Sequence, residues 1–144
     1  MRVVLDTSVW ISALLWTGTP HRLIELAEGG VITICATTEI LAELRGVLER
    51  ERFARKLAEC QTTVHEVLAA VLHLVTLYPT SPVQGIIPAD PDDDMFVACA
   101  LSAQADCIVS GDQHLLQLRQ YGGIEVLAPR AFLERFSPET LQPK

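Results

Sequence analysis

The sequence lacks the features of membrane-embedded and secreted proteins. It contains no apolar segment of the roughly 20 residues that a membrane-spanning helix requires. Its amino terminus, MRVVLDTSVW, reaches an acidic residue at position 6, which is not typical of a signal peptide. We therefore expect a cytoplasmic protein with no membrane partner.

The chain also lacks CxxC pairs, which are typical of zinc sites and of thiol-exchange sites. It has four cysteines, of which Cys35, Cys99 and Cys107 lie in apolar surroundings. Cysteines in such surroundings usually behave as small buried apolar residues. The sequence therefore predicts free thiols in the core rather than disulfides or a zinc site.

Several reaction types are excluded because their residues are missing. A phosphoacceptor receiver domain needs a lysine beside its acids, and the only lysines here are Lys56 and Lys144. A phosphatase of the haloacid-dehalogenase type needs Asp-x-Asp after its first strand, where this chain has Ser8 in the second place. The sequence also shows no Ser-His-Asp or Cys-His set for nucleophilic catalysis.

What is present is the pattern of one α/β domain. A chain of 144 residues that is 49% apolar and 20% charged is long enough for a single core. Short β-branched runs predict five strands, at residues 2–5, 31–35, 73–78, 106–110 and 124–127. Helices are predicted over 37–50, 61–73 and 95–105. We expect a mostly parallel five-stranded sheet in one domain over residues 1–144, with 137–144 as a short tail.

The stretch ADPDDDMFVACA places four aspartates at the start of an apolar helix. Their spacing is similar to that of a calcium loop, but Met95 and Leu101 stand where that loop needs Gly and Glu. Two interpretations remain open. The run is either an over-acidic helix cap or part of a site that gathers carboxylates around a divalent cation.

Four acids that are distant in sequence are expected at one edge of the sheet. Asp6 ends the first strand, Asp112 follows the fourth, and Asp94 opens the helix before the fourth strand. Glu43 lies in the second turn of the helix after the second strand. Parallel sheets bind ligands at the edge where strands end and helices begin. Carboxylates collected there suit Mg²⁺ or Mn²⁺.

The charges of the chain are divided unevenly. The net charge is −7, but six aspartates and no Lys or Arg lie between Asp90 and Asp112, which leaves twelve acids against eleven bases elsewhere. A basic patch around residues 45–56 suits nucleic-acid phosphates, or it is a solvated helix face interleaved with Glu49 and Glu51. The basic residues of this patch are Arg45, Arg50, Arg52, Arg55 and Lys56.

The motifs VVLDTSVW, TTEILAELRGVL, DPDDDMFVACAL and IVSGDQHLL, in this order, resemble the PIN-domain family of ribonucleases, and most narrowly its toxin components of bacterial toxin-antitoxin pairs. The resemblance covers nearly the whole chain. It implies a three-layer α/β/α fold and hydrolysis of RNA phosphodiester bonds with Mg²⁺ or Mn²⁺. It further implies an antitoxin partner and a homodimer.

The resemblance also implies roles for individual residues. The metal-site acids are Asp6, Glu43, Asp94 and Asp112, and their supporting residues are Thr7, Ser8 and Ser110, with Asp92 and Asp93 able to share the work of Asp112. Members of the family often carry a second acid two residues after Asp112, where this chain has His114. His114 is either an outer-sphere group or a surface residue of a helix, and we favour the surface residue. We interpret Asp90 as a residue that shapes the loop. A degenerate PIN fold that only binds RNA or a protein is the alternative function.

Overall fold

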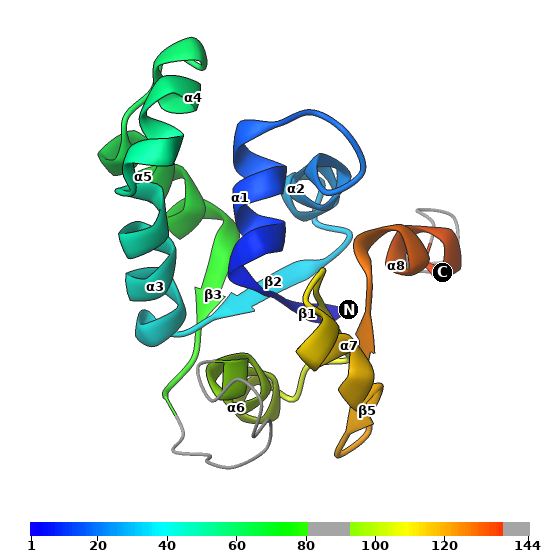
Figure 1. Ribbon diagram of the computed structural model, residues 1–144. Coiled ribbons are helices and arrows are strands. Elements are labelled where there is room, and N and C mark those ends of the chain that lie inside the picture. The colour runs from blue at the N-terminus through cyan, green and yellow to red at the C-terminus, as the bar shows by residue number, and fades with distance from the viewer. Residues whose placement is uncertain (81–92, 137–144) are drawn as a thin grey trace.

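The computed structural model describes residues 1–80 and 93–136, which form a central sheet covered by helices on both faces (Figure 1). The strands have the order β3-β2-β1-β4-β6-β5, and all neighbouring pairs are parallel except β5 and β6. The strands are β1 (Arg2–Leu5), β2 (Thr33–Ala36), β3 (Val75–Leu77), β4 (Cys107–Val109), β5 (Gln120–Tyr121) and β6 (Ile124–Leu127). The helices are α1 (Thr7–Leu15), α2 (His21–Glu28), α3 (Thr38–Leu48), η1 (Glu51–Phe53), α4 (Ala54–Glu59), α5 (Val64–Leu74), α6 (Asp94–Ala103), α7 (Gln113–Leu118) and α8 (Pro129–Arg135).

The apolar residues of β1 divide the core into the two layers expected of a three-layer fold. Val3 and Leu5 belong to a cluster with buried residues of α1, α2, α3, α5 and α8. Val4 points the other way, into a cluster formed largely by α6 and the start of α7. Successive residues of a strand face opposite sides, so a strand with helices on both faces must be apolar throughout. This explains why RVVL has no polar alternation.

The expected α/β class and the mostly parallel sheet are confirmed, but the sheet has six strands rather than five. The additional strand β5 contains only two residues, both exposed. It is joined to β6 by Gly122 and Gly123, which both have positive φ angles, 57° and 83°. Such angles suit glycine and allow the tight antiparallel turn. Because β5 is so short and exposed, the sequence contains no apolar run that would predict it.

The helices predicted over 37–50, 61–73 and 95–105 are present as α3, α5 and α6. Thr37 and Thr63 cap α3 and α5, since their hydroxyls accept hydrogen bonds from the backbone N–H groups of Ile40 and Glu66.

Asp90 and Asp92 lie outside the described residues. Among the described helices, none is both long and apolar enough to cross a membrane.

The thiols are free, as the sequence predicts, and three of the four are buried. Burial raises the pKa of Cys99 to about 12 and that of Cys107 to about 11, which keeps both thiols protonated at neutral pH. Burial also raises the pKa of Cys35. Only the thiolate reacts with disulfide reagents, so these three groups should be inert in the folded protein.

We expect one thiol, that of the exposed Cys60, to react with an aromatic disulfide reagent at neutral pH, and the other three to react only after unfolding. Absorbance of the released thiolate, measured with and without denaturant, gives the number of reactive thiols in the unfolded and in the native protein. A Cys60→Ser variant is the control and should show no rapid phase. Rapid reaction of a second thiol in the native protein would contradict the packing of α6 on the sheet.

Candidate active site

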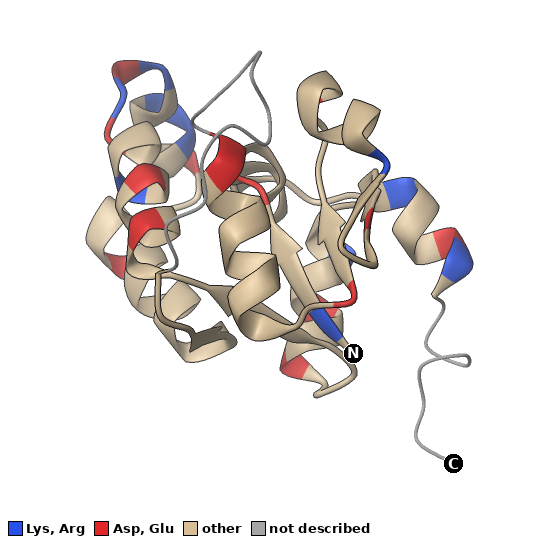
Figure 2. Cartoon of the chain, turned by 90° about the horizontal axis from the view of Figure 1, so that it is seen from below, with Lys and Arg blue, Asp and Glu red and all other residues tan. Residues whose placement is uncertain are grey.

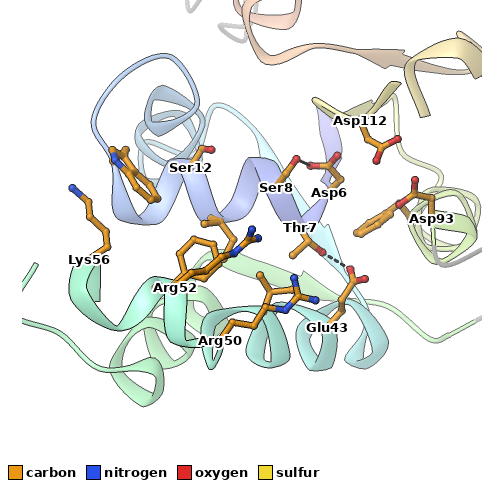
Figure 3. A pocket seen from close by; sticks show the side chains of 15 residues that line it. Asp6, Thr7, Ser8, Ser12, Glu43, Arg50, Arg52, Lys56, Asp93 and Asp112 are labelled. Atoms are coloured by element: carbon orange, nitrogen blue, oxygen red, sulfur yellow. Dashed lines mark hydrogen bonds between the residues drawn. The ribbon is translucent and has the colours of Figure 1, made fainter. Parts of the chain in front are cut away.

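A pocket of about 580 Å³ lies where β1 ends and α1 begins, and it is acidic at one end and basic at the other. Figure 3 shows Asp6, Glu43, Asp93 and Asp112 gathered at one side of the view, with Arg50, Arg52 and Lys56 extending away from them. The acids come from four separate segments of the chain, so the topology brings together residues that are distant in sequence. The pocket therefore offers acids to cations bound with a nucleic-acid substrate and bases to the phosphates of that substrate.

Asp6 is the most buried acid of the pocket, with 3% of its surface exposed. It follows β1 and caps α1, because its Oδ1 accepts a hydrogen bond from the backbone N–H of Val9 at 2.8 Å. The Ser8 hydroxyl donates to the same oxygen at 2.9 Å, and the Ser110 hydroxyl donates to Oδ2. Burial raises the pKa of the Asp6 carboxyl, these hydrogen bonds oppose the rise, and the nearby Asp112 carboxylate adds to it.

Ser110 joins the ends of β1 and β4. Its hydroxyl is fully buried, donates to Asp6 and accepts a hydrogen bond from the backbone N–H of Asp112 at 2.9 Å. The Asp112 carboxylate in turn caps α7 by accepting from the backbone N–H of His114 at 2.7 Å. These contacts join Asp6 and Asp112 at the edge of the sheet where the parallel strands β1 and β4 end.

Glu43 reaches the pocket from the second turn of α3. The Thr7 hydroxyl donates a hydrogen bond to Glu43 Oε2, so the first residue of α1 positions an acid that is 36 residues away in sequence. Both residues line the pocket. Thr7, Ser8 and Ser110 thus all contact carboxylates, in the positions that the resemblance implied for supporting residues.

The start of α6 presents two adjacent acids in different surroundings. Asp93 lines the pocket, whereas Asp94 is buried, with 6% of its surface exposed, and is not among the residues that line the pocket. Figure 2 shows this acidic first turn of α6 in red. Asp93 occupies the N-cap position, but its side chain does not cap the helix. Capping alone therefore does not account for Asp93.

His114 is exposed, as expected of a surface residue, and it also lies beside the acids. Its Nδ1 is 3.7 Å from Asp112 Oδ1. One potential ligand atom from each of Asp93, Asp112 and His114 lies within 4.8 Å of the others. The imidazole is partly exposed but stands beside the acidic end of the pocket. In the sequence, the only signal that His114 would lie near the acids was its position two residues after Asp112.

The basic patch predicted from the sequence divides into two groups. Arg50, Arg52 and Lys56 line the pocket. Arg45 and Arg55 do not, and each forms an ion pair with the glutamate one helical turn later, Glu49 at 3.7 Å and Glu59 at 3.6 Å. Sequence reasoning did not identify Trp16, which also lines the pocket, because a single aromatic residue after an apolar helix has no periodic signature.

The donor set of the acidic end fits a hard divalent cation. It offers carboxylate oxygens from Asp6, Glu43, Asp93 and Asp112, and Mg²⁺ and Mn²⁺ prefer oxygen ligands of this kind. Neighbouring carboxylates repel one another, so the Asp112 carboxylate adds to the raised pKa of Asp6, whose main cause is burial. A bound cation would remove that repulsion.

The raised pKa of Asp6 gives metal-free protein a pH-dependent stability. The folded state holds a proton on this carboxyl more tightly than the unfolded chain, so the free energy of unfolding falls as pH rises from the ordinary value of 3.8 through the raised pKa. Asp6→Asn removes this loss. In EDTA, we expect the variant to gain stability relative to wild type between pH 4 and pH 7.

Urea unfolding at both pH values measures the difference. The asparagine can keep its partners, because its oxygen accepts from Val9 and Ser8 while its amide faces the Ser110 hydroxyl. Glu39→Gln, which changes an exposed acid outside the pocket, is the control and should show no such gain. A wild type that becomes more stable than Asp6→Asn as pH rises would contradict the assignment.

Comparison with known proteins gives the family of this fold and site. The family model of the PIN domain matches residues 2–114, whereas no curated protein sequence matches the chain. The fold is similar to that of a chain in the crystal structure of VapBC2 from Rickettsia felis bound to a DNA fragment from the promoter. That similarity has a TM-score of 0.57 at 15% identity and covers 88% of this chain and 97% of the other. Since the family model spans the structure from β1 to the start of α7, the chain belongs to the PIN domain family.

Proposed function

We propose that the protein is a metal-dependent ribonuclease that hydrolyses RNA phosphodiester bonds at a carboxylate-held Mg²⁺ or Mn²⁺ site. The observation that carries the proposal is the convergence of Asp6, Glu43, Asp93 and Asp112 on one pocket whose other end is basic. Membership of the PIN domain family supports it, and the preference for RNA over DNA comes from that family alone.

The acids hold the cation in this proposal. Asp6 contributes from the start of α1, Glu43 from α3 and Asp112 from the start of α7, and the Asp93–Asp94 pair contributes from the start of α6. When bound, such an ion activates a water molecule and neutralises charge on the reacting phosphoryl group. Among the described residues that line the pocket, no other group offers a comparable nucleophile or base set.

The remaining residues of the site act on the acids and the substrate. Ser8 and Ser110 fix both oxygens of Asp6, and Thr7 fixes one oxygen of Glu43, so fewer rotamers are open to either carboxylate. Fixed ligands lower the cost of organising the site around the transition state. Arg50 and Arg52, which line the pocket, contact phosphates of the substrate in this proposal.

We further propose that the protein is the toxin of a cytoplasmic toxin-antitoxin pair, with a cognate antitoxin as its protein partner and a homodimer as its assembly. The likeness of fold to a VapBC2 chain supports this role. The alternative is a PIN fold that binds RNA or a protein without cleaving it. Hydrolysis separates the two, because only the nuclease needs the cation for turnover.

We expect the purified protein to cleave single-stranded RNA with added Mn²⁺ or Mg²⁺, and EDTA to abolish cleavage because the acids alone cannot activate water. Gel analysis of a labelled oligonucleotide follows the reaction. An Asp6→Asn preparation made in parallel controls for contaminating ribonuclease. Full activity of the wild type in EDTA, absent from that control, would end the metal-dependent account.

Glu43→Gln should lower the rate by about 10²-fold or more, the scale on which one electrostatic stabiliser of a transition state acts. Glu39→Gln is its matched control, since Glu39 is exposed one turn earlier on the same helix and does not line the pocket. Equal rates for the two variants would show that Glu43 has no special role.

The two acids at the start of α6 can be ranked in the same assay. Asp93 lines the pocket and Asp94 does not, so we expect Asp93→Asn to lower metal affinity more than Asp94→Asn does, and Asp94→Asn to change stability more. The Mn²⁺ concentration for half-maximal rate and the melting temperature give the two readouts. The opposite ranking would restore Asp94, the acid named by the family motif, as the direct ligand.

A further inference from the structure

We propose that Trp16, with Lys56 beside it, forms a stacking subsite for a nucleobase of single-stranded RNA at the basic end of the pocket. The inference rests on the proposed ribonuclease function and adds the contact that fixes where the strand lies. It assigns a binding role to a residue that neither the motifs nor the family resemblance singled out.

Trp16 is exposed where a tryptophan would ordinarily be buried. The residue is 45% exposed at the end of α1, whereas Trp10 on the same helix is fully buried in the core. Trp16 lines the same pocket as the acids. An exposed aromatic ring in a pocket offers a flat apolar face, and bases of any sequence can stack on such a face.

The charge beside Trp16 favours nucleic acid as the occupant. Lys56 Nζ lies 4.9 Å from the centre of the Trp16 ring, a distance suited to a cation–π contact. Its contact with the Glu59 carboxylate, at 3.9 Å, is at the limit of an ion pair. A base stacked on Trp16 would therefore bring its phosphate close to a cation. A basic peptide would be repelled from the same place.

Arg50 and Arg52 continue the positive charge toward the acids. Figure 3 shows Lys56, Arg52, Arg50 and Glu43 following one another along one side of the pocket. Within residues 1–80 and 93–136, neither arginine forms an ion pair with a carboxylate, unlike Arg55, which is paired with Glu59. The guanidinium of Arg52 lies 4.7 Å from the centre of the Phe53 ring, which holds it in place.

The separation of the two ends sets the length of strand involved. Helix α1 begins after Asp6 and ends before Trp16, so ten steps of about 1.5 Å place the two residues about 15 Å apart along its axis. At about 3.4 Å for each stacked nucleotide, this distance corresponds to roughly four nucleotides, and to fewer in an extended strand. A base on Trp16 would thus lie a few nucleotides from the phosphate at the acids.

The test measures binding of labelled single-stranded RNA in EDTA, where no cleavage occurs. For an oligonucleotide of about ten nucleotides, we expect Trp16→Leu to raise Kd about tenfold, within the range measured for loss of one base–aromatic stack. Trp16→Phe should recover most of the affinity. Tyr121→Leu changes an exposed aromatic residue outside the pocket and should leave Kd unchanged.

Length dependence distinguishes stacking from a structural effect. A dinucleotide is too short to reach from the acids to Trp16, so Trp16→Leu should not change its rate of metal-dependent cleavage. Arg52→Ala should reduce the slope of log K against log salt by about one for the longer strand, and Arg55→Ala should not. Quenching of wild-type tryptophan fluorescence by RNA tests the stack without any substitution.

The outcomes separate the subsite from the nuclease. Cleavage by wild type with Kd unchanged in Trp16→Leu, and no quenching, overturns the subsite and leaves the proposed function standing. Quenching and Trp16-dependent binding without cleavage in Mn²⁺ overturn the nuclease and support the subsite. An RNA that neither binds nor is cleaved overturns both. Binding of a basic peptide, but not RNA, to the Trp16 end would also overturn the subsite.

Discussion

The burial of one carboxylate, that of Asp6, is the constraint on which the rest of the site depends. Removing a charge from water costs several kcal/mol unless hydrogen bonds and neighbouring charges replace the water. The fold supplies hydrogen bonds from the Val9 amide and from the Ser8 and Ser110 hydroxyls. These donors come from α1 and from the end of β4, so Asp6 is satisfied only when both are correctly placed.

The same contacts explain why the acids form one unit. The backbone N–H of Asp6 bonds to the carbonyl of Val109 at 3.1 Å, which extends the pairing of β1 and β4 into the site. Ser110 then connects the Asp6 side chain to the backbone of Asp112. A change that shifts β4 relative to β1 would therefore move two carboxylates at once. Glu43 is joined to this unit through Thr7, the residue that follows Asp6.

Most of the fold was predictable because its signals are local. The five longer strands are runs of apolar and β-branched residues, and α3 and α5 have threonine caps. The meeting of Asp6, Glu43 and Asp112 followed from parallel topology, which places strand ends and helix starts on one edge. The strand β5 was not predictable, because it has only two residues and both are exposed. The Gly122–Gly123 turn brings them beside β6, and their own β propensity gives no signal.

Other parts of the site depend on orientation, which the sequence does not record. Asp93 and Asp94 are identical in type and adjacent in sequence, but neighbouring residues of a helix point about 100° apart, and here Asp93 lines the pocket whereas Asp94 is buried outside it. Similarly, Arg50 and Arg55 look alike in sequence, but Arg55 is placed one turn before Glu59 and is paired with it. Arg50 lies between α3 and η1, where its backbone is extended, and its side chain lines the pocket. The position of each basic residue along the chain therefore decides whether it faces the pocket, where Arg50, Arg52 and Lys56 lie and Arg45 and Arg55 do not.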